Sequence, residues 1–355
     1  MHCILHIGTR KTGSSSIQSY LRKNAAALER QGILVPRNVA ENGFQFSVAS
    51  DPLMTLWFYL ARESIKTEAE LKVLQDRTRR DLNADIDRVK PRTVILSSED
   101  FSFFTDERQT RFAKEYFNQF SSYSIVVYLR RQDRYVVSDI STGLLNGGQK
   151  SFTLRDDPAA LKHLNYKELI DAWATVFGRE AMKIRVFEPE HLKGGDLLTD
   201  FCGLTGIDMH GLTTPERANP SVTAVAQSFL RIANQEIPSI LENGDFNHSR
   251  GPLNMVLIKY FSGKPPLPSR HEAENFYNYF RASNEALRQE YLAGHAGPIF
   301  KEDFSTYPEV GEEQQLEFKD GAELAVTLWR DSQQEIATLK RKLEALENRK
   351  RIREI

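Results

Sequence analysis

Short apolar runs alternate with longer amphipathic segments through the first half of this chain. Four runs have the length and flanking residues of buried strands, at residues 3–7, 94–96, 125–129 and 184–187. Strands that alternate with helices predict an α/β fold, in which a central parallel sheet is flanked by helices and ligands bind outside the carboxyl ends of the strands. We expect residues 41–90 to form a helical insertion between the first two strands.

The last part of the chain has a different pattern. Residues 302–320 are acidic and rich in turn-forming residues, and a polar helix follows as a C-terminal helical extension. Its apolar positions Ile336, Leu339, Leu343 and Leu346 are spaced 3, 4 and 3, which is a coiled-coil seam of barely two heptads. Such a helix is too short to be stable alone. Two interpretations stay open: the helix packs back onto the body, or it joins two subunits in a homodimer.

The loop after the first strand is basic and rich in hydroxyl groups. Gly8 and Gly13 bracket it, Lys11 lies between them, and Ser14, Ser15 and Ser16 open the following helix. Free N–H groups and the dipole at a helix start favour an anion, and a glycine lets the anion approach the backbone. The loop therefore predicts a phosphate site. The alternative is an ordinary capped surface helix.

The order of residues in this loop separates two nucleotide-binding families. A nucleoside-triphosphate P-loop reads G-x-x-x-x-G-K-[ST], with the lysine after the second glycine. Here Gly8 and Gly13 have that spacing, but Lys11 precedes the second glycine and Ser14 stands where the P-loop lysine would be. The run Lys-Thr-Gly-Ser-Ser resembles instead the K-[ST]-G-[ST]-[ST] loop of sulfotransferases. The resemblance implies that the loop holds the phosphosulfate of 3′-phosphoadenosine 5′-phosphosulfate, through Arg10, Lys11, Thr12, Gly13, Ser14 and Ser15.

A second segment supports the same family. The strand at residues 124–129 ends at Arg130, and Ser138 follows eight positions later on an amphipathic helix. Sulfotransferases carry an arginine and a serine at this spacing, and both contact the 3′-phosphate of the donor. A guanidinium fork suits a phosphate because it makes two parallel hydrogen bonds. Taken alone, Arg130 would more often form a surface ion pair.

Weaker similarities to bacterial sulfotransferases continue in the family's order along the chain. They lie at residues 165–166, 173, 177–180, 184–189, 217–221, 282–286 and 297–300. The resemblance therefore implies a P-loop-like sulfotransferase domain over residues 1–300, followed by an acidic linker and the C-terminal helix over 301–355. Two departures are the Arg131-Gln132 pair, where many members have Asn-Pro, and the lack of a glycine-rich basic loop near the C-terminus.

Sulfuryl transfer needs a proton acceptor and positive charge beside the leaving phosphate. Lys11 fits the second role, and Glu99 is the candidate base because it follows the buried strand at residues 93–98. Cytosolic members of the family place a catalytic histidine at the end of this strand, and several glycan-modifying members use a glutamate. A partly desolvated carboxylate would have a usefully raised pKa. Asp100, His6 and His163 are the competitors, and Glu99 capping a turn or pairing with an arginine is the structural alternative.

The composition agrees with a sizeable enzyme without naming it. Hydrophobic residues make up 40% of the 355 residues and charged residues 27%, which excludes a disordered chain. The net charge of −1 provides no global field that would recruit nucleic acid or an anionic membrane. Two cysteines exclude a disulfide framework. Without an apolar run long enough to cross a membrane, or a targeting segment before the first strand, a soluble cytoplasmic protein is expected.

We therefore predict a sulfotransferase that moves a sulfuryl group from 3′-phosphoadenosine 5′-phosphosulfate to a hydroxyl or amine. A carbohydrate or glycoconjugate acceptor follows from the similarity to bacterial and glycan-modifying members. No metal is expected. Two alternatives stay open: a P-loop-type small-molecule kinase, which needs magnesium, and a non-catalytic nucleotide-binding protein.

Overall fold

Five parallel strands in the order β2-β3-β1-β4-β5 form the centre of the computed structural model. They are β1 (His2–His6), β2 (Ile33–Leu34), β3 (Thr93–Ser97), β4 (Ser122–Leu129) and β5 (Met182–Val186). The structure describes residues 1–148, 153–215, 221–312 and 316–353, with side chains to residue 347. The similarity at residues 217–221 therefore lies almost wholly outside the described residues. The predicted α/β fold with a central parallel sheet, flanking helices and a C-terminal helix is confirmed.

Helices cover both faces of the sheet because alternate strand residues point to opposite sides. One face carries Ile4, Ile95 and Val126, and these side chains are buried with those of three helices: α1 (Ser14–Lys23), α2 (Ala25–Arg30) and α9 (Leu197–Thr205). The other face carries Leu5 and Ile125 and is buried by a larger set: α3 (Phe44–Ala49), α4 (Trp57–Arg62), α5 (Glu68–Val89), α6 (Glu107–Tyr116), α8 (Tyr166–Phe177) and α12 (Arg270–Tyr291).

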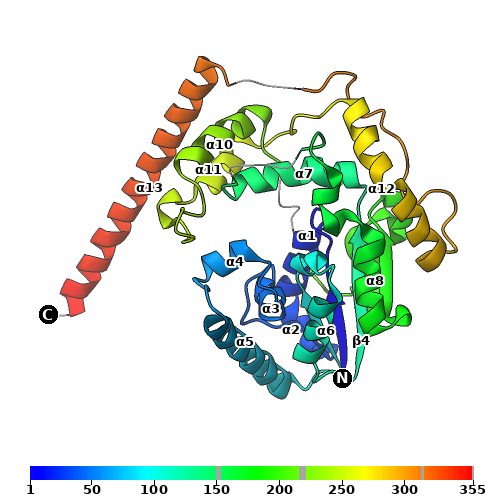
Figure 1. Ribbon diagram of the computed structural model, residues 1–355. Helices are drawn as coiled ribbons and strands as arrows, with labels where there is room; N and C mark the ends of the chain where they lie inside the picture. The colour runs from blue at the N-terminus through cyan, green and yellow to red at the C-terminus, as the bar shows by residue number, and fades with distance from the viewer. Residues whose placement is uncertain (149–152, 216–220, 313–315, 354–355) are drawn as a thin grey trace.

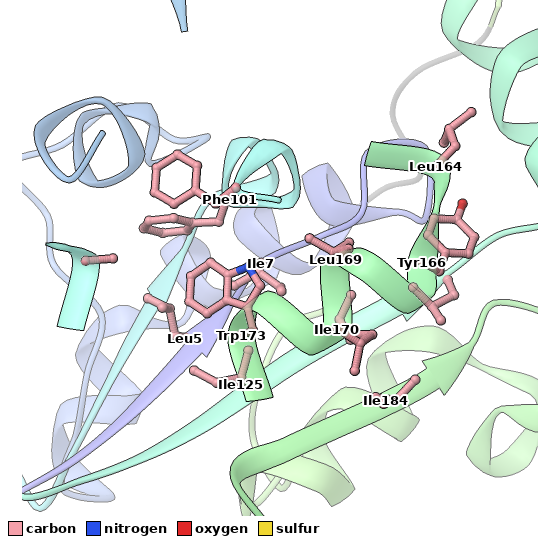
Figure 2. Close-up of a cluster of buried hydrophobic side chains, with 14 of the residues drawn as sticks. Leu5, Ile7, Phe101, Ile125, Leu164, Tyr166, Leu169, Ile170, Trp173 and Ile184 are labelled. Atoms are coloured by element: carbon pink, nitrogen blue, oxygen red, sulfur yellow. The ribbon is translucent and has the colours of Figure 1, made fainter. Parts of the chain in front are cut away.

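Trp173 of α8 lies at the centre of the larger core. Its side chain is fully buried, and Figure 2 shows it close to Leu5 and Ile125 of the sheet. The ring of Phe101 meets it edge-on at a centroid distance of 5.8 Å. Removing such an aromatic side chain from a core costs about 3–5 kcal/mol. Phe101, two residues after Glu99, is thereby packed into the core.

A smaller apolar cluster joins four helices, the first of which is also buried in the larger core through Tyr135, Val136 and Val137. These are α7 (Gln132–Leu145), α10 (Ala224–Glu236), α11 (Leu253–Phe261) and α13 (Phe318–Arg353). Leu144, Leu257 and Leu324 are fully buried in this cluster, so the start of α13 is fixed to α7 and α11. Short 3₁₀ turns complete the described elements, at Glu99–Phe103 (η1), Pro158–Ala160, Lys162–Leu164, Arg179–Ala181, Pro189–His191, Lys193–Gly195 and His248–Arg250.

Beyond Leu324, α13 leaves the body of the molecule. Figure 1 shows it running along the outside, past α10 and α11. Lys259 and Tyr260 of α11 contact Asp331 with distances of 2.8 and 2.9 Å. The seam positions Ile336, Leu339, Leu343 and Leu346 are 43–61% exposed, so they do not pack back onto the described body. No described helix has both the length and the apolar character needed to span a membrane.

The segment after residue 300 begins inside the core. Phe304 and Tyr307 are buried with the larger cluster. Arg131, at the start of α7, donates to the carbonyl oxygens of Lys301 and Asp303 at 2.6 and 2.8 Å. Residues 301–307 are thus packed against the body, and the division of the chain at residue 300 stays a prediction.

Candidate functional site

The predicted site residues follow three neighbouring strands of the sheet. The loop with Lys11 follows β1, Glu99 follows β3 and Arg130 follows β4, and β1 lies between the other two. The connection from β1 leads toward the β2 side of the sheet, whereas the connection from β4 leads to β5 on the opposite side. Such a reversal of direction is where ligands bind in open α/β sheets.

The β1–α1 loop is held in shape by β4 and by its own hydroxyl groups. The N–H of Thr9 donates to the Tyr128 carbonyl at 2.9 Å, and the N–H of Tyr128 donates to the Gly8 carbonyl at 2.7 Å. The hydroxyls of Thr12 and Ser14 both donate to the carbonyl of Thr9, at 2.6 and 3.1 Å. These two predicted donor-binding side chains therefore shape the loop from inside, whereas Ser15 is exposed on the first turn of α1.

Two glycines permit close approaches in this loop. A methyl group at Gly8 would come within 3.0 Å of the Glu99 Cα, so glycine allows β1 and η1 to meet at the site. Gly13 has φ 83° and precedes α1, and no described side chain caps that helix. A methyl group at Gly13 would also overlap the side chain of Leu197. Among the described residues, the N–H groups of Ser14 and Ser15 consequently have no side-chain oxygen as a partner, as an anion site requires. The N–H groups of Ser16 and Ile17 donate to the Gly13 carbonyl.

Lys11 connects the loop to α7. Its φ is 63°, and its ammonium donates to the Thr142 hydroxyl at 2.6 Å. Burial lowers the pKa of Lys11, and the neighbouring Arg130 and Arg10 lower it further, while the carboxylates of Asp139 and Glu99 oppose the change. The lysine therefore stands in a partly buried site where its charge is not fully compensated.

Arg130 lies directly against the same loop. Its Nη1 donates to the carbonyl of Lys11 at 2.6 Å, and the hydroxyl of Tyr166 donates to the Arg130 carbonyl at 2.6 Å. Burial and the charge of Arg134 lower the pKa of Arg130. No carboxylate within the described chain forms an ion pair with it, unlike the surface ion pair considered as its alternative role. Ser138 is partly exposed on α7.

Arg10 faces the acidic side of the site. Its Nη2 lies 2.6 Å from Asp100 Oδ1, its Nε lies 3.9 Å from Glu99 Oε1, and its guanidinium lies 4.8 Å from the centre of the Phe103 ring. The structure thus directs the side chain of Arg10 toward η1. Its predicted role in donor binding has no further support from this geometry.

Glu99 has the properties that a general base requires. Its side chain is 25% exposed, so most of it is covered. Burial raises the pKa of Glu99 to about 7, with Asp100 and Asp139 raising it and Arg10 and Lys11 lowering it. A carboxyl group with this pKa is partly ionised near neutral pH and can both accept and release a proton.

The competing bases are placed less favourably. Asp100 is fully buried and is bound to Arg10. His6 is buried with its Nδ1 2.8 Å from the Ser97 hydroxyl, and burial lowers its pKa to about 3. His163 packs on the ring of Phe103, and burial lowers its pKa to about 3 as well. Imidazoles with such low pKa values are weak bases.

The structure also brings three residues of α7 to the site that the motifs did not indicate. Tyr135, Asp139 and Thr142 are spaced 4 and 3 along the helix and therefore share a face with Ser138. The Thr142 hydroxyl accepts a hydrogen bond from Lys11, and the negative charge of Asp139 raises the pKa of Lys11. Their helical spacing from Ser138 was visible in the sequence, but only contacts with the β1–α1 loop identify this face as the relevant one.

A cavity of about 410 Å³ lies on the opposite face of α7. Val137 and Ile140 line it together with residues of α10 and residues 266–268. None of the predicted site residues is among its lining residues. The candidate site is therefore the edge of the sheet and not this cavity.

Comparison with known proteins gives distant similarities. No family model matches the chain. A protein of Archaeoglobus fulgidus described as uncharacterized is 25% identical over 208 residues, which cover 56% of this chain and 54% of that protein. The chain thus spans about half the length of this curated relative. A solved sulfotransferase from Alicyclobacillus acidocaldarius superposes with a TM-score of 0.38 and 16% identity over 65% of this chain and 91% of that one. This similarity is too low to indicate the function of this chain.

Proposed function

We propose that this chain is a sulfotransferase that uses 3′-phosphoadenosine 5′-phosphosulfate. The observation that carries the proposal is the joining of Lys11 and Arg130 through the loop backbone, with Glu99 at the end of the neighbouring strand. Burial lowers the pKa of both cations, as expected for an incompletely neutralised pair that favours an anion. The lysine-before-glycine order of the loop supports sulfuryl rather than phosphoryl transfer.

The donor would bind across the ends of β1 and β4. Lys11 and the first N–H groups of α1 would hold the 5′-phosphosulfate, while Arg130 and Ser138 would hold the 3′-phosphate. The spacing of Arg130 and Ser138 and the orientation of the Arg130 guanidinium toward the loop support this assignment. Thr12 and Ser14 would act indirectly, by keeping the carbonyl of Thr9 turned away from the anion.

In the proposed reaction, Glu99 would act on the acceptor and Lys11 on the donor. Glu99 accepts the acceptor's proton as a bond forms between the acceptor atom and sulfur. The bond from sulfur to the bridging oxygen breaks, and Lys11 stabilises the charge that develops on the leaving phosphate. The products are a sulfated acceptor and 3′-phosphoadenosine 5′-phosphate. The acceptor would belong to a carbohydrate or glycoconjugate, on the similarity to bacterial and glycan-modifying sulfotransferases.

A second copy of the chain would bind the exposed seam of α13. In the heptad with Ile336 and Leu343 at a, Leu339 and Leu346 take the d positions. Glu335 and Lys340 then occupy g and e, and Lys342 and Glu347 occupy the next g and e. Two parallel helices would place each acidic residue opposite a basic one of the partner. Exposure of all four seam positions and this charge pattern support a parallel homodimer.

Nucleotide binding without metal tests the proposed function. Thermal shifts would be measured with 3′-phosphoadenosine 5′-phosphate, ADP and ATP in EDTA, and again with ATP and magnesium. A ligand present at 100 times its Kd stabilises the native state by about 2.7 kcal/mol. We expect the bisphosphate to stabilise the chain without metal. Stabilisation only by ATP with magnesium would favour the kinase, and binding without transfer of labelled sulfate would favour a non-catalytic protein.

The role of Glu99 has its own test. Glu99→Gln keeps the size of the side chain and removes its basicity, so the turnover should fall about a hundredfold or more while nucleotide affinity persists. Near-normal turnover per folded molecule would transfer the role to Asp100 or another group.

A further inference from the structure

One face of α7 brings unpaired polar groups to the transfer site. Tyr135 is 1% exposed, and its hydroxyl has no hydrogen-bond partner within the described residues. Asp139 Oδ1 is also buried, and among those same residues it has no donor. Thr142, one turn further along the same face, accepts a hydrogen bond from Lys11. A buried polar group without a partner costs about 1–3 kcal/mol, so folding alone gives no reason to keep two of them here.

These groups share their surroundings with the proposed base. The carboxylates of Glu99, on η1, and Asp139, on α7, both raise the pKa of Lys11. Tyr135 is close enough to Asp139, Arg10 and Glu99 for their charges to affect its hydroxyl. Two carboxylates and one phenol are therefore close enough for their charges to interact near Lys11, the residue that the proposed mechanism places beside the donor.

We propose that Asp139 and Tyr135 form an acceptor subsite that binds an ammonium group, so that the acceptor is a primary amine. This inference rests on the proposed sulfotransferase function and names its substrate class. An ammonium offers three N–H donors and a positive charge, and it satisfies Asp139 Oδ1 and the Tyr135 oxygen together. A single hydroxyl group offers one donor and leaves the second carboxylate uncompensated.

The proton balance of the reaction agrees with two carboxylates. An alcohol loses one proton when its oxygen bonds to sulfur. An ammonium loses two, one to expose the nitrogen lone pair and one as the N–S bond forms and the S–O bond to the leaving phosphate breaks. The products are a sulfamate, 3′-phosphoadenosine 5′-phosphate and two protons. Asp139 provides the acceptor for the first proton and Glu99 for the second.

Asp139 also has a simpler role available, as a counter-ion that positions Lys11. The two roles differ in what they affect. A counter-ion of Lys11 influences the turnover of every acceptor, because Lys11 acts on the donor. A subsite that binds the ammonium and takes its first proton influences the KM and turnover of amine acceptors alone. Paired acceptors that differ only in the amino group therefore separate them.

The experiment uses the full chain, a donor labelled with ³⁵S, and two acceptors of equal length: a fully deacetylated chito-oligosaccharide and a cello-oligosaccharide. Nitrous acid at low pH cleaves at N-sulfated glucosamine and leaves sulfate esters intact, so it reports the linkage formed. We expect label in the chito-oligosaccharide as a sulfamate. Asp139→Asn and Tyr135→Phe should each raise its KM about tenfold or more, with unchanged affinity for 3′-phosphoadenosine 5′-phosphate. Asp87→Asn, on the exposed surface of α5, is the matched control and should change neither.

Each other result has a definite meaning. Sulfate esters in place of sulfamates would overturn the amine subsite and leave the proposed sulfotransferase intact. Equal loss of turnover for both acceptors in Asp139→Asn would also overturn it, in favour of a positioning role. No transfer together with no binding of 3′-phosphoadenosine 5′-phosphate by the wild type would overturn the proposed function and the inference with it. Preserved nucleotide-induced thermal shifts in the variants verify that they are folded.

Discussion

A base that is held in a covered site should lower the stability of its own protein at high pH. Burial raises the pKa of Glu99 from about 4.5 to about 7. In the unfolded chain this carboxyl ionises near its ordinary value, so between these two pH values the folded state binds more protons than the unfolded state. Stability must then fall as the pH rises through this window, and the loss is complete above pH 7.

The size of the effect follows from the same two values. At about 1.36 kcal/mol for each pKa unit, the difference between 4.5 and about 7 corresponds to about 3 kcal/mol. Glu99→Gln has no charge to bury. We therefore expect the variant to match the wild type near pH 4.5 and to exceed its free energy of unfolding by up to about 3 kcal/mol at pH 8.

Urea denaturation of both proteins at pH 4.5, 6 and 8 measures this difference. Glu115→Gln is the matched control, because Glu115 is exposed on α6, and its effect should not vary with pH. A Glu99→Gln protein that is less stable than the wild type at pH 8 would refute the reasoning. That result would mean that Arg10 and Lys11 stabilise the Glu99 carboxylate by more than burial costs it.

Three further predictions follow from the site and from α13. Lys11→Met should lower turnover at least a hundredfold and weaken 3′-phosphoadenosine 5′-phosphate binding less than tenfold, because the strongest interaction of Lys11 forms with charge that develops during reaction. Steady-state kinetics and calorimetry measure the two losses, and equal losses would contradict this prediction. Arg130→Lys should weaken that nucleotide about tenfold and leave adenosine 5′-phosphate unchanged in competition assays, since lysine cannot make two parallel hydrogen bonds, whereas equal weakening of both would reject the assignment of the 3′-phosphate. Leu343→Glu should convert a dimer into a monomer in light scattering because it places charges in the seam, and a monomeric wild type would exclude the homodimer.

Strand positions were predictable where several apolar residues are consecutive. The runs at residues 3–7, 94–96, 125–129 and 184–187 correspond to β1, β3, β4 and β5. The strand β2 was missed because it contains only Ile33 and Leu34, too few residues to show a pattern. The order of the strands depends on which apolar surfaces meet in three dimensions, and no local pattern contains that information.

Much of the candidate site was predictable because its residues follow strands that are recognisable in the sequence. Glu99, Arg130 and the Lys11 loop follow readable strand ends, and parallel strands bring such ends to one edge. Their roles remain predictions. The inward direction of the Thr12 and Ser14 hydroxyls could not be read, because it depends on where the carbonyl of Thr9 points.

Adjacent arginines show most clearly what local sequence cannot decide. Arg130 and Arg131 both follow β4, yet Arg130 faces the loop while Arg131 is 1% exposed and forms two hydrogen bonds with Asp133, at 2.7 and 2.8 Å. Arg131 also donates to the carbonyl oxygens of Lys301 and Asp303, and its guanidinium lies 4.0 Å from the centre of the Phe304 ring. The hydroxyl of Tyr307 donates to Asp133 at 2.6 Å. These partners lie about 170 positions after Arg131 in the sequence.

The contact between Arg131 and residues 301–307 has a consequence for synthesis on the ribosome. The loop, Glu99 and Arg130 all emerge within the first 130 residues, whereas the carbonyl partners that fix the start of α7 emerge about 170 residues later. Domains generally fold from the N-terminus as they are made. Here the helix that carries Ser138 gains its last anchors only when most of the chain has left the ribosome. A nascent chain that stalls before residue 301 would carry every described strand and every residue of the candidate site, and would still lack the contacts that Arg131 and Asp133 make with residues 301–307.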